Sequence, residues 1–298
     1  MHRREFLLRG AAASAMLSMG GLMGRSALAA GQSKVGGMRL GLVTYNLAKD
    51  WTLDEIIERC QRTGFEGVEL RTTHKHGVEP TLSAEERAAV RRKFEGSKVT
   101  LWGLGTTCEY HSPDQAEVRR QVDLTKQFVD LAADVGAIGV KVRPNGLPKE
   151  VPVEQTLKQI GNALKECGDY AAAKKQEIWL EVHGGGTSLL PNMRTIMETA
   201  NHPWVFVCWN SNGSDVKDGS VKESLELVKQ WVREVHLREL YADYPWAELF
   251  GLLQANAFDG FTNAEISEST DPETVMRYFR ALWLALKGQT GPAGAFHP

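Results

Sequence analysis

The sequence predicts an α/β protein folded as one (β/α)8 barrel. Short β-rich runs alternate with amphipathic stretches along the chain, and eight such pairs follow one another at intervals of roughly thirty residues. The connections are short, and no long linker divides the 298 residues. Because a barrel of this kind uses about 250 residues as one domain, a single TIM barrel fits better than two domains. A doubly wound sheet is the alternative, but no G-x-G-x-x-G motif follows the first strand, where a dinucleotide site requires it.

The predicted strands are short runs in which β-branched and aromatic residues are frequent. In chain order they cover residues 39–47, 67–73, 100–107, 137–144, 177–184, 204–210, 232–240 and 261–269. Several of them alternate polar with apolar residues, so that one face carries charge and the other, with Leu70, Val142 and Val182, suits packing against helices.

A helix is predicted after each strand from apolar residues at helical spacing. The predicted helices cover residues 53–64, 84–96, 115–134, 153–173, 191–200, 220–230, 245–255 and 271–287. Thr52 and Ser83 precede the first two helices as N-cap residues, and Gly64 ends the first. The order of strand, helix, strand is that of a parallel barrel.

Residues 1–30 are typical of a twin-arginine export signal. HRREFLL at 2–8 contains the arginine pair, the next twenty or so residues are small and apolar without an acid, and Ala-Leu-Ala at 27–29 suits cleavage. Glycines and Arg25 interrupt the apolar stretch, which disfavours a membrane anchor. We therefore expect a periplasmic or exported protein without stable membrane insertion, with a signal peptide at 1–30, a linker at 31–37, the barrel at 38–287 and a flexible tail at 288–298.

Composition excludes several classes of protein and partner. With 42% hydrophobic and 24% charged residues, the chain is neither collagen-like, disordered nor a coiled coil. The formal net charge is −2, and removal of residues 1–30, with four arginines and one glutamate, leaves −5. No basic field is left for a nucleic acid. The four cysteines lie far apart without a C-x-x-C pair, so we expect buried small hydrophobes.

Charged and metal-competent side chains gather near the carboxyl ends of the predicted strands, where the active site of such a barrel lies. The candidates for substrate contact are Glu69, Arg71, His74, His111, Lys141, Arg143, His183 and Arg238. The sixth, seventh and eighth predicted strands carry Asn210, His236 and Glu265. Mutual ion pairing can account for any one of these charges, but charges from so many strands favour a site.

This order of residues resembles the xylose-isomerase-like barrel superfamily, whose members include sugar isomerases and ketose 3-epimerases. The resemblance rests on LEVHG, CWN, EVHLRE and NAEIS on the last four strands, and it covers residues 38 to 287. It implies one divalent cation held by Glu181, Asn210, His236 and Glu265. Two carboxylates, an imidazole and a carbonyl oxygen suit Mn2+, Mg2+, Co2+, Fe2+ or Zn2+. The family's strand-six ligand is usually an Asp with a His three residues later, whereas this chain has Asn210 and Gly213.

The resemblance further implies that Glu181 and Glu265 are catalytic and move a proton beside a carbonyl, with the cation stabilising the enediolate. The expected function is that of a sugar isomerase or epimerase acting on a free carbohydrate or cyclitol, in which Lys141, Arg143 and Arg238 can grip an anionic sugar. Two alternatives stay open: a 3-keto-glycoside lyase that uses the same site, and a non-catalytic periplasmic sugar-binding protein. A homo-oligomer is also compatible with the sequence. A nuclease on the same fold is disfavoured by the acidic charge.

Overall fold

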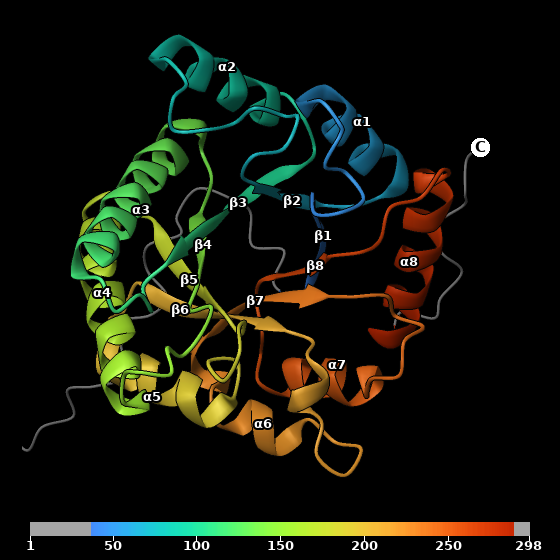
Figure 1. Ribbon diagram of the computed structural model, residues 1–298. Helices are drawn as coiled ribbons and strands as arrows, with labels where there is room; N and C mark the ends of the chain where they lie inside the picture. The colour runs from blue at the N-terminus through green and yellow to red at the C-terminus, as the bar shows by residue number, and fades with distance from the viewer. Residues whose placement is uncertain (1–36, 289–298) are drawn as a thin grey trace, which may run out of the picture. The chain divides into compact units, whose positions relative to one another are not determined.

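A computed structural model describes residues 37–288, and these residues form a closed eight-stranded parallel barrel. The predicted single (β/α)8 barrel is confirmed, and the doubly wound alternative is not. The strands are β1 (Arg39–Val43), β2 (Gly67–Arg71), β3 (Thr100–Glu109), β4 (Gly139–Arg143), β5 (Glu177–Glu181), β6 (Val205–Asn210), β7 (Val232–Leu237) and β8 (Phe261–Ala264). Each pairs with its sequence neighbours, and β1 pairs with β8 to close the ring (Figure 1).

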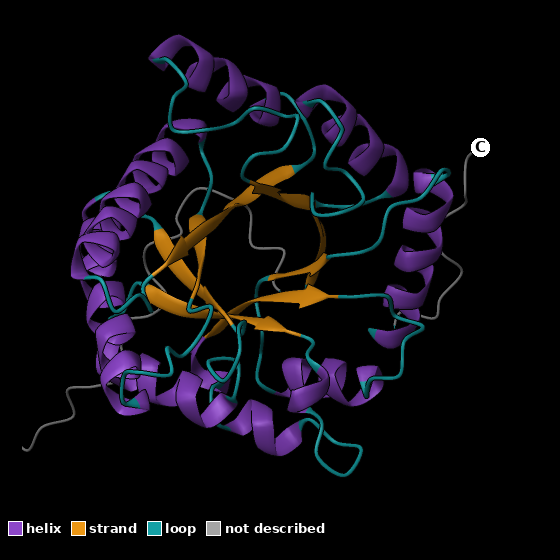
Figure 2. Ribbon diagram, viewed as in Figure 1, coloured by secondary structure: helices purple, strands orange, loops and turns teal. Residues whose placement is uncertain are grey.

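Helices surround the strands on the outside (Figure 2). They are α1 (Leu53–Thr63), α2 (Ala84–Glu95), α3 (Gln115–Val135), α4 (Val153–Ala173), α5 (Leu190–Ala200), α6 (Lys222–Glu226), α7 (Trp246–Ala255) and α8 (Pro272–Leu286). The helix predicted at 220–230 is shorter than expected, because Val228 leaves the helical backbone with φ −130° and a separate 3-10 turn follows at Lys229–Trp231.

The predicted N-caps are present. Thr52 and Ser83 each accept a hydrogen bond from the backbone N–H three residues later. The carboxylates of Glu55 and Glu86 in turn accept from the backbone N–H of the cap residue, which completes two capping boxes. Gly64 ends α1 in the left-handed conformation with φ 77°.

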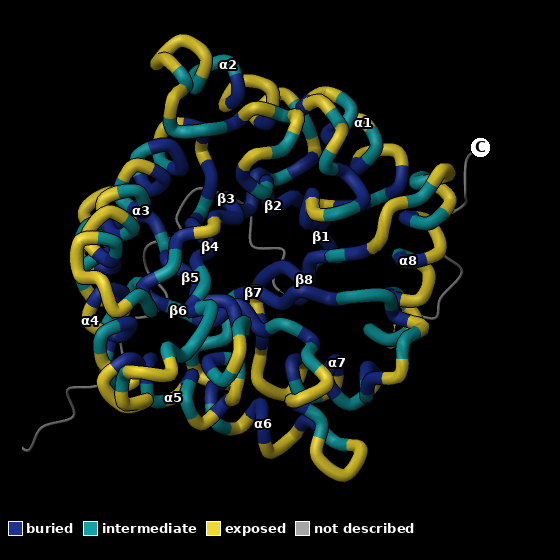
Figure 3. The backbone as a smooth tube through the Cα atoms, in the orientation of Figure 1, coloured by how far each residue is buried: buried dark blue, intermediate teal, exposed yellow. Residues whose placement is uncertain are grey.

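Two apolar cores lie on either side of the sheet. The larger one fills the layer between strands and helices, as the buried strands and the exposed outer helix faces in Figure 3 indicate. The smaller one lies inside the barrel and consists of Trp102, Trp179, Cys208 and Phe261. Arg39, at the first residue of β1, places its guanidinium 4.3 Å from the Phe261 ring centroid. The small core therefore fills the amino-terminal part of the barrel and leaves the carboxyl ends of the strands to polar side chains.

All four cysteines are free and buried, as expected of small hydrophobes. Within residues 37–288, no helix is long and apolar enough to cross a membrane. The predicted signal peptide, all but the last residue of the linker, and all but the first residue of the tail lie outside the described residues.

Candidate functional site

A layer of buried polar side chains crosses the barrel above the small aromatic core. Its fully or almost fully buried members are Glu69, Lys141, Glu181, Glu234, His236 and Asn263. They occupy alternate positions of their strands, so they point inward while their neighbours pack against helices. Glu265 follows β8 and is 25% exposed, which places its carboxylate at the open side of this layer.

His236 lies at the centre of the layer. Its Nε2 donates a hydrogen bond to Glu69 Oε2 at 2.9 Å. Its Nδ1 is buried and has no hydrogen-bond partner among residues 37–288. Carboxylate oxygens of Glu181 and Glu265 lie 3.8 Å and 3.7 Å from Nδ1. Nδ1 and the two carboxylates therefore face one another across less than 4 Å.

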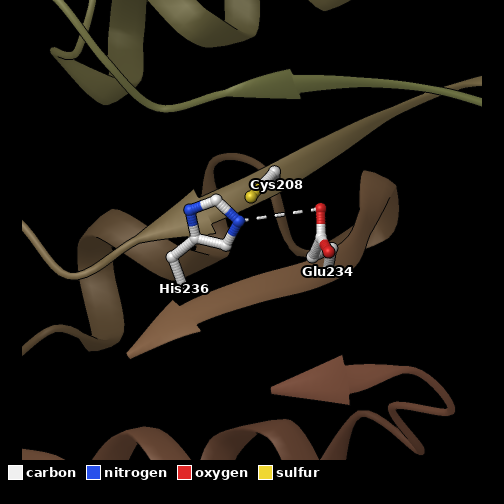
Figure 4. A group of neighbouring side chains, drawn as sticks. All are labelled: Cys208, Glu234 and His236. Carbon is white, nitrogen blue, oxygen red and sulfur yellow. Dashed lines mark ion pairs between the residues drawn. The ribbon is translucent and has the colours of Figure 1, made fainter. Parts of the chain in front are cut away.

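A second group of potential ligands lies on the opposite side of the His236 ring (Figure 4). Glu234 Oε2 is 3.9 Å from Nε2, and the Cys208 thiol lies beside the ring. Burial and the nearby Glu69 raise the pKa of Glu234, and burial raises the pKa of Cys208. Both groups are therefore neutral, and Nε2 is already bonded to Glu69. The Nδ1 side is better suited to a cation, because Glu181 is ionised there and Glu265 offers a second carboxylate.

Glu181 is held in place from two sides. Lys141 Nζ lies 2.6 Å from its Oε2, and Asn210 Nδ2 donates to its Oε1 at 3.1 Å. Burial opposes ionisation of Glu181, but Lys141 and His236 outweigh burial and lower its pKa to about 2. Glu181 is thus a fixed carboxylate with little tendency to take up a proton.

Charge in the layer is nearly balanced. Burial lowers the pKa of His236, but the Glu69 carboxylate beside Nε2 raises it, and the net direction is upward. Burial also opposes ionisation of Glu69, but His236 outweighs burial and lowers its pKa. Three carboxylates thus face one ammonium and one imidazolium, and a divalent cation that displaced the Nδ1 proton would neutralise the layer.

Two glycines leave space for this arrangement. A Cβ at Gly105 would lie 2.2 Å from Glu69 Oε1, and one at Gly41 would lie 1.9 Å from Asn263 Oδ1. Asn263 in turn donates to Glu234 Oε1 at 2.5 Å. The polar layer therefore requires glycine at position 41 on β1 and at position 105 on β3.

The other predicted residues surround the opening. Arg71, His74, His111, Arg143, His183 and Arg238 are all half-buried at strand ends or in the following loops. Arg143 forms an ion pair with Glu109, to which Asn145 also donates at 2.7 Å. His111 Nδ1 lies 3.9 Å from the same Glu109.

His74 is a neutral member of this ring of residues. Its Nδ1 lies 3.0 Å from Thr44 Oγ1, and its ring stacks on Tyr45 with 6.3 Å between centroids. Burial, with help from His76 and Arg71, lowers the pKa of His74 to about 4. An uncharged imidazole beside a tyrosine ring suits contact with hydroxyl groups.

The structure places two of the predicted substrate contacts inside the buried layer. Glu69 bonds to His236 and Lys141 to Glu181, so both orient neighbouring side chains. Sequence reasoning missed Cys208, Glu234 and the bond from Asn263. The signal was present, because Glu234 stands two residues before His236 on the same strand face.

Comparisons with known proteins agree with this architecture. Residues 57–283 match the family described as xylose isomerase-like TIM barrel. No match to the chain is found among curated proteins. The apo form of 3-keto-D-glucoside 4-epimerase YcjR from E. coli is similar at 15% identity and TM-score 0.70, over 84% of this chain and 99% of that chain.

Two further solved structures are similar to the same degree. A zinc-bound form of the IolI protein has 15% identity and TM-score 0.72, over 86% of this chain and 100% of that one. An L-ribulose 3-epimerase has 14% identity and TM-score 0.72, over 85% of this chain and 95% of that one. At this identity the likeness concerns the fold, whereas the family match covers most of the sequence. The chain belongs to the xylose isomerase-like TIM barrel family.

Proposed function

We propose that the protein is a metal-assisted sugar isomerase or epimerase that removes a proton next to a carbonyl group of a free carbohydrate or cyclitol. The observation that carries the proposal is the buried His236 Nδ1, which has no hydrogen-bond partner in the described part of the chain and faces carboxylate oxygens of Glu181 and Glu265 within 4 Å. Similar folds in YcjR and L-ribulose 3-epimerase support a sugar as the substrate.

The residues present fit a divalent cation. Glu181, His236 and Glu265 offer one ligand atom each within 4.8 Å of one another, and Asn210 is adjacent through its bond to Glu181. Carboxylate and imidazole donors suit Mn2+, Mg2+, Co2+, Fe2+ or Zn2+. Such an ion would supply Lewis-acid stabilisation of negative charge on substrate oxygens.

The surroundings of the two glutamates separate their roles. Glu181 is fully engaged by Lys141 and Asn210, and its pKa of about 2 makes it a weak base. Glu265 is a quarter exposed at the open side of the layer, so its carboxylate can reach a substrate carbon. We assign proton removal to Glu265. Glu181 would serve as a fixed ligand of the cation and as the carboxylate on the opposite face of the substrate carbon.

The twin-arginine signal supports export, and the mature protein would then meet free sugars outside the cytoplasm. The proposed partner is a small carbohydrate. Secretion of an epitope-tagged chain into the periplasm, abolished when Arg3 and Arg4 are both changed to Lys, tests this location.

The first test is the metal content of the protein purified without chelator. We expect about one equivalent of a transition metal by elemental mass spectrometry. His236→Ala should lose the metal, while Glu198→Gln on the exposed face of α5 should retain it. Absence of metal even after reconstitution would refute the metal-assisted reaction and favour a sugar-binding protein.

The second test follows hydrogen exchange at carbons next to the carbonyl of keto-sugars in D2O by NMR. Glu265→Gln should fold normally and lose exchange, because an amide cannot accept the proton. Full exchange by this variant would remove Glu265 from the reaction. Release of a leaving group together with exchange would identify the lyase alternative.

A further inference from the structure

We propose that the substrate carries a carboxylate, which Arg71 and Arg238 bind at the opening of the barrel. The proposal rests on the proposed function and names its substrate class, a sugar acid. The carbonyl end of such a molecule would reach the layer of Glu181, His236 and Glu265, and its carboxylate would stay among the arginines at the strand ends.

Charge is divided between two levels of the barrel. The buried layer holds carboxylates, and its one ammonium, Lys141, is bonded to Glu181. The opening holds three arginines, Arg71, Arg143 and Arg238, at the ends of β2, β4 and β7. In a chain with a net charge of −2, this gathering of cations is a local feature. It leaves an inner level suited to a cation and an outer level suited to an anion.

Two of the three arginines form no ion pair with a carboxylate of the described residues. Arg143 is neutralised by Glu109, which excludes it as the main anion ligand. Within residues 37–288, neither Arg71 nor Arg238 has a carboxylate oxygen within 4.0 Å of a guanidinium nitrogen. Of the three residues expected to grip an anionic sugar, Lys141, Arg143 and Arg238, the proposal keeps Arg238 and puts Arg71 in place of the other two.

Arg71 is half-buried at the last residue of β2. Its side chain makes one long hydrogen bond, from Nη1 to the Thr72 carbonyl at 3.4 Å. The nearby Glu79 carboxylate is occupied, since it accepts from Thr72 Oγ1 at 2.7 Å and from the Thr73 N–H at 2.6 Å. Four of the five guanidinium donors thus have no partner among the described residues.

Arg238 is in the same condition on the other side of the opening. Its Nε is buried without a partner in the described part of the chain, and its guanidinium lies 5.5 Å from the Tyr244 ring centroid. Two acidic groups are close by. Glu239 accepts from Ser267 Oγ at 2.6 Å, and Asp215 accepts from the Asn212 N–H at 2.9 Å. Burial raises the pKa of Asp215 to about 7, so this group compensates Arg238 weakly at neutral pH.

A half-buried guanidinium without an anion loses part of its hydration, and no ion pair offsets this cost in free energy. A planar carboxylate offers two oxygens to its forked donors, which is the arrangement that arginine binds most strongly. One carboxylate on a sugar satisfies this requirement at the opening. A phosphate has the same general chemistry, and the test separates the two sources.

The test compares sugars that differ at one carbon. D-Fructose, D-fructuronate and D-fructose 6-phosphate carry a hydroxyl, a carboxylate and a phosphate at the same end, and D-glucose with D-glucuronate provides a second pair. Binding is measured by calorimetry on the protein as purified. We expect each acid to bind about tenfold or more tightly than its neutral partner, the factor that one charge-assisted hydrogen bond provides. The preference should weaken as salt is added.

Variants identify the ligands. Arg71→Gln and Arg238→Gln should each reduce the affinity for the acid toward that of the neutral sugar, and should reduce the affinity for the neutral sugar much less. Arg194→Gln is the matched control, because Arg194 lies on the outer face of α5 and pairs with Glu198. Thermal unfolding of each variant confirms that the barrel is folded.

Equal affinity within both pairs, no measurable binding of either acid, or a preference that survives both substitutions would each overturn the proposal. Tighter binding of D-fructose 6-phosphate than of D-fructuronate would overturn the carboxylate in favour of a phosphate.

Failure of the proposed function can be distinguished from failure of the anion site. A protein without metal or hydrogen exchange that still prefers acids would refute the isomerase and keep the anion site.

Discussion

At the scale of single residues, the orientation of His236 depends on Glu69, and the place of Glu69 depends on Gly105. The Glu69 bond to Nε2 fixes the ring so that Nδ1 faces Glu181 and Glu265. Gly105→Ala would put a methyl group 2.2 Å from Glu69 Oε1 and displace that carboxylate. We expect metal affinity to fall about 10- to 100-fold, as when a carboxylate behind a metal-binding histidine is lost. Titration calorimetry measures the change, and unchanged affinity would show that Glu69 does not orient the ring.

Asn210 stands where the resemblance described above leads us to expect an Asp. Its amide bonds to Glu181 Oε1 without adding charge. Asn210→Asp would add a carboxylate to the donor set, so we expect tighter binding of Mn2+, by about tenfold or more. The same charge beside Glu181 should lower the thermal stability of the metal-free protein. If competition with a fluorescent chelator finds equal affinity in both proteins, Asn210 is not a ligand.

Asp215 makes stability depend on pH. Burial raises its pKa to about 7, so the folded state holds a proton that the unfolded chain releases near pH 4. The contribution of Asp215 is fully present below about pH 4 and is lost as pH rises to about 7, at a cost on the order of 2–4 kcal/mol. Asp215→Asn should therefore unfold at higher urea concentration than the wild type at pH 8, and the gain should disappear near pH 4. Asp123→Asn, on the exposed face of α3, is the control, and an equal gain at both pH values would contradict the assignment.

At the scale of elements, the alternation of strand-like and helical segments predicted the position of every strand, but the observed ends of several strands differ from the predicted ones. Residues 44–47, 182–184 and 265–269 were predicted as strand and lie in loops, because the chain leaves the sheet where the opening begins. β3 instead continues to Glu109, which places that carboxylate opposite Arg143 on β4. β-Propensity depends on the residues of a segment alone. The length of the observed strand depends on how far the neighbouring strand offers backbone hydrogen-bond partners.

Helical glycines provide a test of local packing. Gly251 lies in the exposed middle of α7, and a Cβ there would meet nothing within 4 Å. Gly251→Ala should raise the free energy of unfolding by about 0.5–1 kcal/mol, because alanine restricts the unfolded chain. Gly161→Ala in α4 should destabilise, since its Cβ would lie 2.5 Å from Thr199 Cβ on α5. Urea denaturation measures both, and a loss of stability in Gly251→Ala would contradict the open environment of α7.

At the scale of the whole molecule, the site exists because the barrel closes. Glu69 and His236 are 167 residues apart. Their hydrogen bond depends on the register of every strand between β2 and β7, including three shifts, which follow Val68, Gly105 and Val207. The sequence predicted that both residues lie near the carboxyl ends of inward faces. It did not predict their depth, which is why Glu69 was expected to contact substrate and Glu234 was overlooked.

Closure also links metal binding to the stability of the entire domain. Glu181, His236 and Glu265 come from β5, β7 and the end of β8, so their ligand atoms converge in the folded barrel and separate in the unfolded chain. An ion that binds the folded state alone adds about 2.7 kcal/mol at a free concentration of one hundred times its Kd. For a domain of this size that is a rise of about 5–10 °C in Tm. Scanning calorimetry should show this rise when Mn2+ is added to chelator-treated protein, and little change in Glu265→Ala. Equal midpoints with and without metal in the wild type would contradict a cation site formed by these strands.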